Sequence, residues 1–210
     1  MVEIIAIDGP ASVGKSTLAK KIAYNYESPI LSSGRLYRAV AVEVINRKIS
    51  PNDEKAIANC VKLIDQDKLK SKKLFSSEVD KISSIISANK FLRNRLKSYQ
   101  RNFPKYNSKN NKYVVIEGRD IGTIIFPNAK YKIFMWADAK TRAKRRFAQI
   151  LKNGKNPSLQ RIYKEIVTRD MNDLTRSIAP LKPAVNSVLL DTTYLDIEQA
   201  FNIVRKLIKP

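Results

Sequence analysis

A run of nine residues near the start of the chain has the types and spacing needed to bind a phosphate. The run consists of Gly9, Pro10, Ala11, Ser12, Val13, Gly14, Lys15, Ser16 and Thr17. It matches the pattern G-x-x-x-x-G-K-[ST], in which backbone N–H groups surround the phosphates, the lysine reaches the β- and γ-phosphates, and the hydroxyl ligates Mg²⁺. These two roles fall on Lys15 and Ser16. The sequence therefore predicts a site for a nucleoside triphosphate.

Such a loop needs a strand before it and a helix after it, and the sequence provides both. Residues 4–7 are apolar, as in a buried strand, and residues 15–26 have helical periodicity. The apolar face of that helix comprises Leu18, Ala19, Ile22 and Ala23. A helix that begins at the loop directs its free N–H groups toward the phosphates.

The rest of the chain alternates strand-like and helix-like segments. Strands are expected at residues 3–8, 29–31, 113–117, 131–136 and 187–191, and helices at 15–26, 35–48, 53–64, 90–103, 140–152, 159–172 and 197–208. This alternation predicts an α/β fold in which helices cover both faces of a parallel sheet. Residues 65–78 are polar and weakly periodic, which indicates a small insertion. In such sheets, ligands bind beyond the carboxyl ends of the strands.

Two of the expected strand-end loops carry polar side chains. The first contains Ser32, Ser33 and Arg38, which could form an N-cap with surface arginines or bind an anion. The second contains Glu117, Arg119 and Asp120, with glycines between and after them. Packing alone explains this second group poorly, and Glu117 is placed to hold Mg²⁺ directly or through water. An ordinary polar turn is the alternative.

Two basic groups follow on expected helices. Residues 141–146 contain three arginines and could be a solvated helix face or a phosphate clamp. Arg169, Asp173 and Arg176 are spaced by four and three residues, so they share one face. That face could be an internal ion-pair ladder, or it could present two guanidinium groups and a carboxylate to a small ligand.

Composition limits the classes of protein to consider. The chain has 210 residues, 43% of them hydrophobic, which is enough for the core of one main domain. The absence of histidine excludes histidine acid–base catalysis and histidine metal sites. The single cysteine excludes an internal disulfide and favours a reducing compartment. Without a candidate membrane span or room for a signal peptide, we expect a cytoplasmic protein.

The net charge of +21 invites a nucleic-acid interpretation. Most of it lies in residues 62–112 and 140–169. Lysine-rich drift on a solvated surface is one alternative, and the need to balance the charges of bound nucleotides is another. We do not expect nucleic acid to be the main partner.

Over nearly its whole length the chain resembles bacterial cytidylate kinases. The motifs that carry the resemblance are GPASVGKST, SSGRLYR, SANKFLRNR, VVIEGRDIGT, RAKRR, RDMND-x-x-R-x-x-APL and DTT. The resemblance implies transfer of the γ-phosphoryl group of ATP to CMP or dCMP, with Mg²⁺. It also implies a three-layer P-loop fold with a five-stranded parallel sheet. Residues 1–210 would then form one domain, with a monophosphate-binding insertion at 62–87 and a lid at 140–169.

The resemblance also implies roles for individual residues. Those expected to contact the acceptor nucleotide are Ser33, Arg38, Ser84, Arg93, Arg119, Asp120, Arg169, Asp173 and Arg176. Within this set, the pyrimidine ring would be read by Ser33, Arg93, Asp120 and Arg176, the sugar by Ser84, Arg169 and Asp173, and the phosphate by Arg38 and Arg119. The residues expected to be catalytic are Lys15, Arg119 and Arg169, and those expected to hold Mg²⁺ are Ser16 and Glu117. The lid would contribute Arg142, Arg145, Arg146 and Arg161.

The chain departs from the family pattern in the monophosphate-binding region. Ser32 stands where an acidic residue is usual, Phe75 where a basic one is common, and the insertion is short.

Two rival functions are another small P-loop kinase, and a P-loop ATPase or switch that binds nucleic acid. Against the latter, Tyr99, Phe103 and Tyr106 share one helical stripe that we expect in the core. We expect a monomer with small-molecule nucleotides as ligands and no membrane partner.

Overall fold

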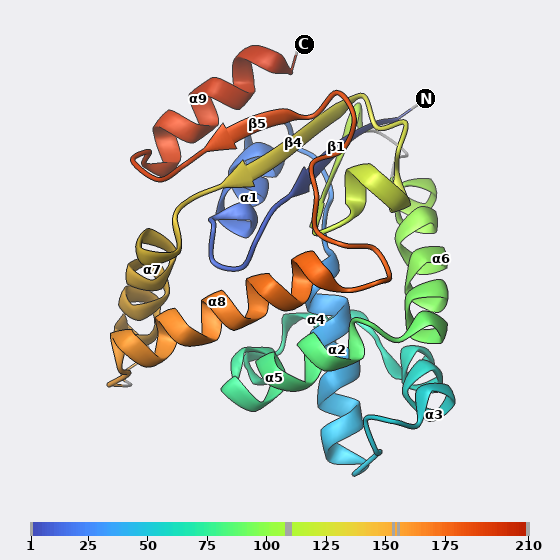
Figure 1. Cartoon of the computed structure of the whole chain (residues 1–210). Helices are drawn as coiled ribbons and strands as arrows, with labels where there is room; N and C mark the ends of the chain where they lie inside the picture. Colours follow the sequence, from blue (N-terminus) through green and yellow to red (C-terminus); the bar gives the residue numbers. More distant parts are fainter. Residues whose placement is uncertain (1, 108–110, 153, 155, 209–210) are drawn as a thin grey trace. The chain divides into compact units, whose positions relative to one another are not determined.

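The computed structural model describes residues 2–107, 111–152, 154 and 156–208, and the chain divides into two compact units. The first unit comprises the described residues of 1–30 and 107–210, and the second comprises residues 31–106. Each unit has its own helices (Figure 1). No described helix is long and apolar enough to cross a membrane.

The five-stranded sheet has the order β2-β3-β1-β4-β5. Its strands are β1 (Glu3–Asp8), β2 (Ile30–Ser32), β3 (Tyr113–Gly118), β4 (Tyr131–Trp136) and β5 (Val188–Asp191). β1 runs parallel to β3 and β4, and β4 runs parallel to β5. The predicted α/β fold with a five-stranded parallel sheet is confirmed. Its five strands match the expected segments to within a residue or two at each end.

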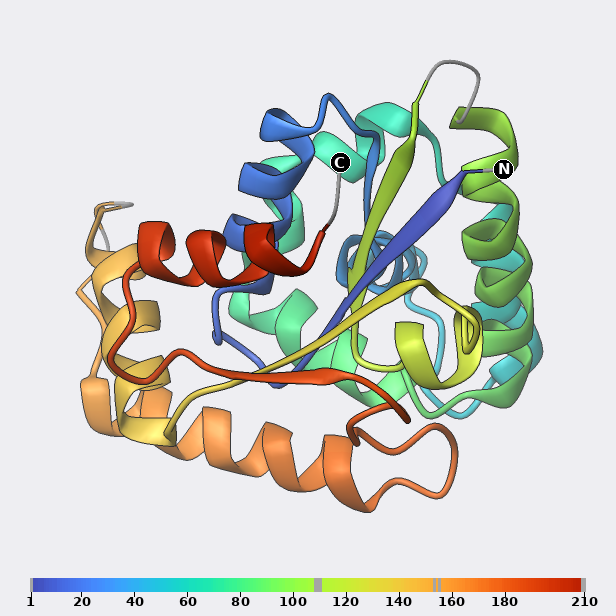
Figure 2. The ribbon, with the colours of Figure 1, turned by 90° about the horizontal axis from the view of Figure 1, so that it is seen from above.

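The helices of the first unit are α1 (Lys15–Asn25), α7 (Ala139–Lys152), α8 (Leu159–Thr175) and α9 (Ile197–Leu207), with a π-helical turn at Ile121–Ile125. Figure 2 shows α1 and α9 next to each other beside the strands. Their apolar faces pack with Ile5, Ile7 and Met135 into one core cluster. The predicted apolar face of α1 is confirmed, since all four of its residues are buried.

The second unit consists mainly of helices. They are α2 (Ser33–Asn46), α3 (Glu54–Asn59), α4 (Gln66–Lys70), α5 (Ser77–Ile86) and α6 (Lys90–Asn107), with 3₁₀ turns at Cys60–Leu63 and Lys72–Phe75. The expected helix at 53–64 is therefore α3 followed by a tighter turn. α5 was not predicted, although Ser76 caps it by accepting a hydrogen bond from Val79 N at 3.2 Å. Its apolar positions Val79 and Ile86 are buried.

The expectation that the aromatic stripe of α6 lies in the core is wrong at its end. Tyr106 is 79% exposed, whereas Tyr99 and Phe103 are half-buried. Tyr106 lies in the last turn of α6, where the helix extends four residues beyond its predicted end. Helical periodicity identifies a face, but it does not show how far the neighbouring elements cover that face.

Candidate active site

The phosphate-binding loop lies between β1 and α1, as predicted (Figure 1). Gly9 has φ +148°, and a Cβ atom there would lie 2.3 Å from the carbonyl oxygen of Met135. Gly14 has φ +104° and caps α1 without a side chain. The first N–H groups of α1 therefore have no capping side chain, which is the arrangement that favours a bound phosphate.

Lys15 is buried at the start of α1, with its ammonium directed back along the loop. Nζ donates a hydrogen bond to the carbonyl oxygen of Pro10 at 2.6 Å, and the residue is 5% exposed. Burial lowers the pKa of Lys15 well below its ordinary value; the charge of Arg119 lowers it further, and that of Glu117 opposes the shift. A bound polyphosphate would supply the negative charge that stabilises the ammonium form.

Ser16 and Glu117 meet across the loop. The Ser16 Oγ donates to Glu117 Oε1 at 2.9 Å, and Glu117 is 4% exposed near the end of β3. A hydroxyl and a carboxylate are hard oxygen donors of the kind Mg²⁺ prefers. The described residues contain no cluster of three or more Cys, Asp or Glu side chains able to hold a metal. Mg²⁺ sites of nucleotide enzymes use one or two protein ligands with substrate phosphates, so this pair fits the ion.

Asp8 ties the end of β1 to the loop that follows β3. Its two carboxylate oxygens accept hydrogen bonds from Ile121 N at 2.9 Å and Gly122 N at 2.7 Å. Burial raises the pKa of Asp8 to about 6, although both hydrogen bonds lower it. The carboxylate therefore fixes the backbone just beyond Glu117, Arg119 and Asp120. Sequence analysis did not single out Asp8.

Arg119, Asp173 and Arg176 form an ion-pair network. Arg119 Nε lies 3.0 Å from Asp173 Oδ2, and Arg176 Nη1 lies 3.5 Å from Asp173 Oδ1. Asp173 is 5% exposed. Burial raises its pKa, but the charges of Arg119, Arg169 and Arg176 outweigh this, and the net pKa is below the ordinary value. Of the predicted ladder, Arg169 and Asp173 lie in α8 and Arg176 is its C-cap residue. The Asp173–Arg176 ion pair of that ladder is present. Its contact with a ligand stays a prediction.

Arg142 supports the phosphate-binding loop from α7. Its guanidinium donates to the carbonyl oxygen of Ala11 at 3.2 Å and to both carboxylate oxygens of Asp170, at 3.1 and 2.5 Å. At 1% exposure it is not on a solvated helix face. That alternative is wrong for Arg142, because these acceptors draw it into the protein.

Arg145 has a similar supporting position, whereas the other two predicted lid arginines lie nearer solvent. Arg145 donates to Thr192 Oγ1 at 3.2 Å and to the carbonyl oxygen of Thr192 at 2.5 Å. Thr192 Oγ1 in turn donates to the carbonyl oxygen of Val13 at 3.3 Å. Arg146 donates to Gln149 and Arg161 to Glu165, within their own helices. Which arginines touch ATP stays a prediction.

In the second unit, two predicted contact residues are held by neighbours that sequence analysis missed. Ser33 Oγ accepts a hydrogen bond from Gln100 Nε2 at 2.5 Å. Arg38 pairs with Asp80, and its Nη1 donates to the carbonyl oxygen of Leu74 at 2.7 Å.

The remaining predicted contact residues of the second unit lie on α5 and α6, and Phe75 lies in the 3₁₀ turn before α5. Phe75, the departure from the basic pattern, stacks against Arg35 and Arg38 with centroid distances of 5.3 and 5.5 Å. Arg93 is buried and donates to the carbonyl oxygen of Ser87 at 3.0 Å. Ser84 lies half-buried on α5.

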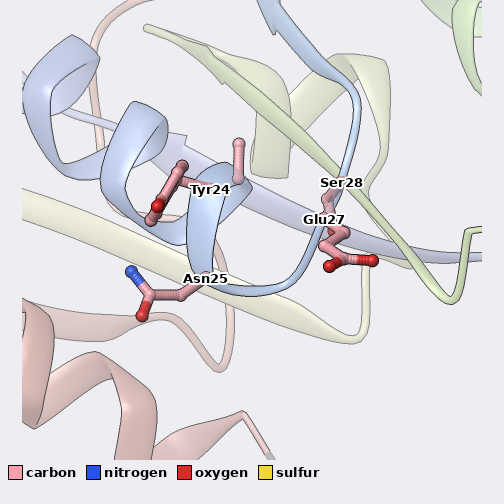
Figure 3. A pocket seen from close by; sticks show the side chains of 5 residues that line it. Tyr24, Asn25, Glu27 and Ser28 are labelled. Carbon is pink, nitrogen blue, oxygen red and sulfur yellow. The ribbon is translucent and has the colours of Figure 1, made fainter.

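A surface hollow in the first unit lies away from the phosphate-binding loop. It is lined by Ala23, Tyr24, Asn25, Glu27 and Ser28, at the C-terminal end of α1 (Figure 3). The loop is at the opposite end of the same helix. None of the predicted site residues lines this hollow, so it plays no part in the site.

Comparison with known proteins agrees with this geometry. Residues 5–210 match the family model described as Cytidylate kinase. The chain belongs to the cytidylate kinase family. A cytidylate kinase of Bartonella tribocorum is 42% identical over 207 residues, covering 99% of this chain and 94% of the relative. A cytidylate kinase of Fusobacterium nucleatum is 36% identical over 217 residues, covering 98% and 97% of the two chains.

Solved structures support the fold assignment. An uncharacterized protein from Eubacterium ventriosum has a TM-score of 0.54 at 19% identity, covering 99% of this chain and 98% of its own. TT1252 from Thermus thermophilus has a TM-score of 0.50 at 18% identity, covering 100% and 99%. At these identities the likeness shows the shared fold, and membership of the cytidylate kinase family follows from the sequence relatives.

Four residues found in the structure had weak or no signals in the sequence. Asp170 directly follows Arg169 in the RDMND motif, and Asp8 directly precedes the phosphate-binding loop. Examining the residue after Arg169 and the residue before Gly9 could have found them. Gln100 and Asp80 have no local signal, because their partners Ser33 and Arg38 are 67 and 42 residues away in the chain.

Proposed function

We propose that this chain transfers the γ-phosphoryl group of ATP to CMP or dCMP, giving ADP and CDP or dCDP. The observation that carries the proposal is the position of the Arg119–Asp173–Arg176 network beside Lys15. The charges of Arg119, Arg169 and Asp173 all act on the ammonium of Lys15, so the network and the phosphate-binding loop form one electrostatic site. Membership of the cytidylate kinase family supports the identity of the acceptor.

Charge and position supply the rate in this proposal. Phosphoryl transfer passes through a loose transition state in which negative charge spreads over the moving group, so no strong general base is needed. Lys15 binds the β- and γ-phosphates of ATP, and Arg119 and Arg169 stabilise the charge that develops during transfer. Lys15 and Arg119 are held in place before the reaction by their hydrogen bonds to Pro10 O and Asp173 Oδ2, which reduces the reorganisation needed.

Mg²⁺ is part of the proposal. Ser16 and Glu117 would hold it, and the ion would neutralise charge on the ATP phosphates. The Ser16–Glu117 hydrogen bond at 2.9 Å keeps both oxygens on the same side of the loop. Glu117 is fixed further by its place in β3, where Ile7 is its partner in β1.

We assign contacts with the acceptor nucleotide to Ser33, Arg38, Ser84, Arg93, Arg119, Asp120, Arg169, Asp173 and Arg176. Asp120 is 3% exposed and Arg93 is 8% exposed, as expected of groups that read a ligand by hydrogen bonds. A site with buried polar groups rejects a base that leaves them unpaired. We therefore expect kcat/KM to be higher for CMP and dCMP than for UMP, and AMP and GMP to be poor acceptors.

An acceptor panel tests the function directly. The purified chain with ATP and Mg²⁺ is offered CMP, dCMP, UMP, AMP, GMP, shikimate and dephospho-coenzyme A, and ADP release is measured. We expect kcat/KM for CMP or dCMP to exceed the others by tenfold or more. Preference for any other acceptor would replace the proposal by another small P-loop kinase. Release of ADP without any acceptor would indicate an ATPase.

The setting of the reaction follows from the same proposal. We propose that the chain acts as a monomer in the cytoplasm, where its nucleotide substrates occur. Sedimentation of the purified chain tests the first statement. A dimer at micromolar concentration would contradict it.

A further inference from the structure

Gln100 is a buried amide on α6, at 1% exposure. Its Nε2 donates a hydrogen bond to Ser33 Oγ at 2.5 Å, and Ser33 is 3% exposed at the start of α2. Both residues lie in the second unit. A buried amide has to use its hydrogen-bonding groups, so this contact fixes the position and direction of Gln100.

The direction of this hydrogen bond determines what Ser33 can offer a ligand. A serine hydroxyl has one proton and two lone pairs. Gln100 uses one lone pair, so the proton cannot point toward the amide N–H group. Among the described residues, no acceptor takes that proton. A buried hydroxyl without an acceptor is costly, and Ser33 is therefore prepared to donate to an incoming group.

We propose that Gln100 is a specificity-determining residue that makes Ser33 a hydrogen-bond donor toward N3 of the pyrimidine ring. The inference rests on the proposed function, in which Ser33 reads the ring. N3 of cytosine is an acceptor, whereas N3 of uracil carries a hydrogen and is a donor. Ser33 held as a donor therefore pairs with CMP and opposes UMP. Gln100 acts through Ser33 and does not itself touch the nucleotide.

The other predicted ring readers are consistent with this assignment. Asp120 has a carboxylate, which suits the exocyclic amino group of cytosine as an acceptor. Arg93 and Arg176 are donors only and suit the acceptor O2, whose two lone pairs can take both. A Ser33 hydroxyl that is fixed as a donor pairs, as the arginines do, with an acceptor atom of cytosine. A Ser33 hydroxyl that accepted from the amino group would repeat the contact assigned to Asp120.

Replacing the amide of Gln100 with a carboxylate tests the proposal. In Gln100→Glu the carboxylate accepts from the Ser33 hydroxyl, so that both serine lone pairs become available to a ligand donor. We expect the ratio of kcat/KM for CMP to kcat/KM for UMP to fall by about tenfold, the effect of one neutral hydrogen bond. The near-isosteric Gln100→Met removes the donor without adding charge. Its ratio should fall less, because the Ser33 hydroxyl can then rotate freely.

Two controls separate this role from a structural one. Asn94→Asp adds the same charge to the exposed side of α6 and should leave the ratio unchanged. In a Ser33→Ala background, Gln100→Glu should no longer change the ratio, because the two residues act as a unit. A ratio unchanged in both Gln100 variants, or the same change with and without Ser33, would overturn the inference. The acceptor panel with the wild-type chain tests the proposed function separately. The chain can be a CMP kinase even if Gln100 does not set its base preference.

Discussion

At the scale of single residues, Lys15 makes the strongest test of the chemistry. Lys15→Ala removes the ammonium that meets the β- and γ-phosphates, and we expect kcat to fall by about 10²–10⁵, the range for single transition-state charges. Folding should be preserved, because the substitution removes a buried charge whose pKa burial already lowers. Turnover and thermal unfolding measure the two effects. Lys20→Ala, on the exposed side of α1, is the matched control. Near-normal turnover in Lys15→Ala would contradict the assignment.

The raised pKa of Asp8 should make the stability of the chain depend on pH. This pKa is raised from 3.8 to about 6 in the folded chain. Well below pH 3.8 the carboxyl is protonated in both states. Between pH 4 and 6 only the folded state keeps the proton, so this group's contribution to stability is lost as pH rises, by about 3 kcal/mol in total.

Asp8→Asn removes this dependence, since the amide does not titrate. The free energy of unfolding, measured with urea at pH 4 and pH 7, should fall by about 2 kcal/mol more in the wild type than in the variant, because at pH 4 the unfolded carboxyl is already partly ionised. The variant also loses one acceptor for Ile121 or Gly122, but that loss is the same at both pH values. Parallel pH dependence in the two proteins would show that Asp8 does not titrate in this window.

At the scale of the elements, the sequence predicted what local patterns encode. The five strands and the face of α1 follow from apolar periodicity, and the phosphate-binding loop follows from glycines with a lysine at fixed spacing. The helix α5 was missed because its capping serine follows a lysine-rich segment without apolar periodicity. Contacts between distant segments had no pattern to reveal them. Neither Arg142 against Ala11 nor Gln100 against Ser33 follows from spacing along the chain.

The contact of α7 with the phosphate-binding loop yields a prediction of its own. Arg142→Lys keeps the charge but loses the fork that spans Ala11 and both oxygens of Asp170. We expect KM for ATP to rise about tenfold, because the loop loses its support, while KM for CMP changes less. Initial-rate kinetics with each substrate varied in turn measure the split. The control is Arg205→Lys, on the exposed side of α9 and outside the predicted site. Equal increases in both KM values would contradict a role in supporting the loop.

At the scale of the whole molecule, the charge of +21 separates the kinase from a nucleic-acid-dependent ATPase. A positive field attracts anionic nucleotides and speeds their encounter, and salt screens that field. For the kinase, we expect kcat/KM for CMP to fall as ionic strength rises from 20 to about 200 mM, a range across which screening strengthens severalfold. kcat should stay nearly constant, since bound substrates are less screened.

At low salt, added RNA should compete weakly with the nucleotides and slow the reaction. An RNA-dependent ATPase would behave in the opposite way, with ATP turnover that RNA stimulates and that is lost steeply with salt. Turnover with and without RNA, at both ends of the salt range, distinguishes the two, and stimulation by RNA in the absence of CMP would refute the kinase as the main function.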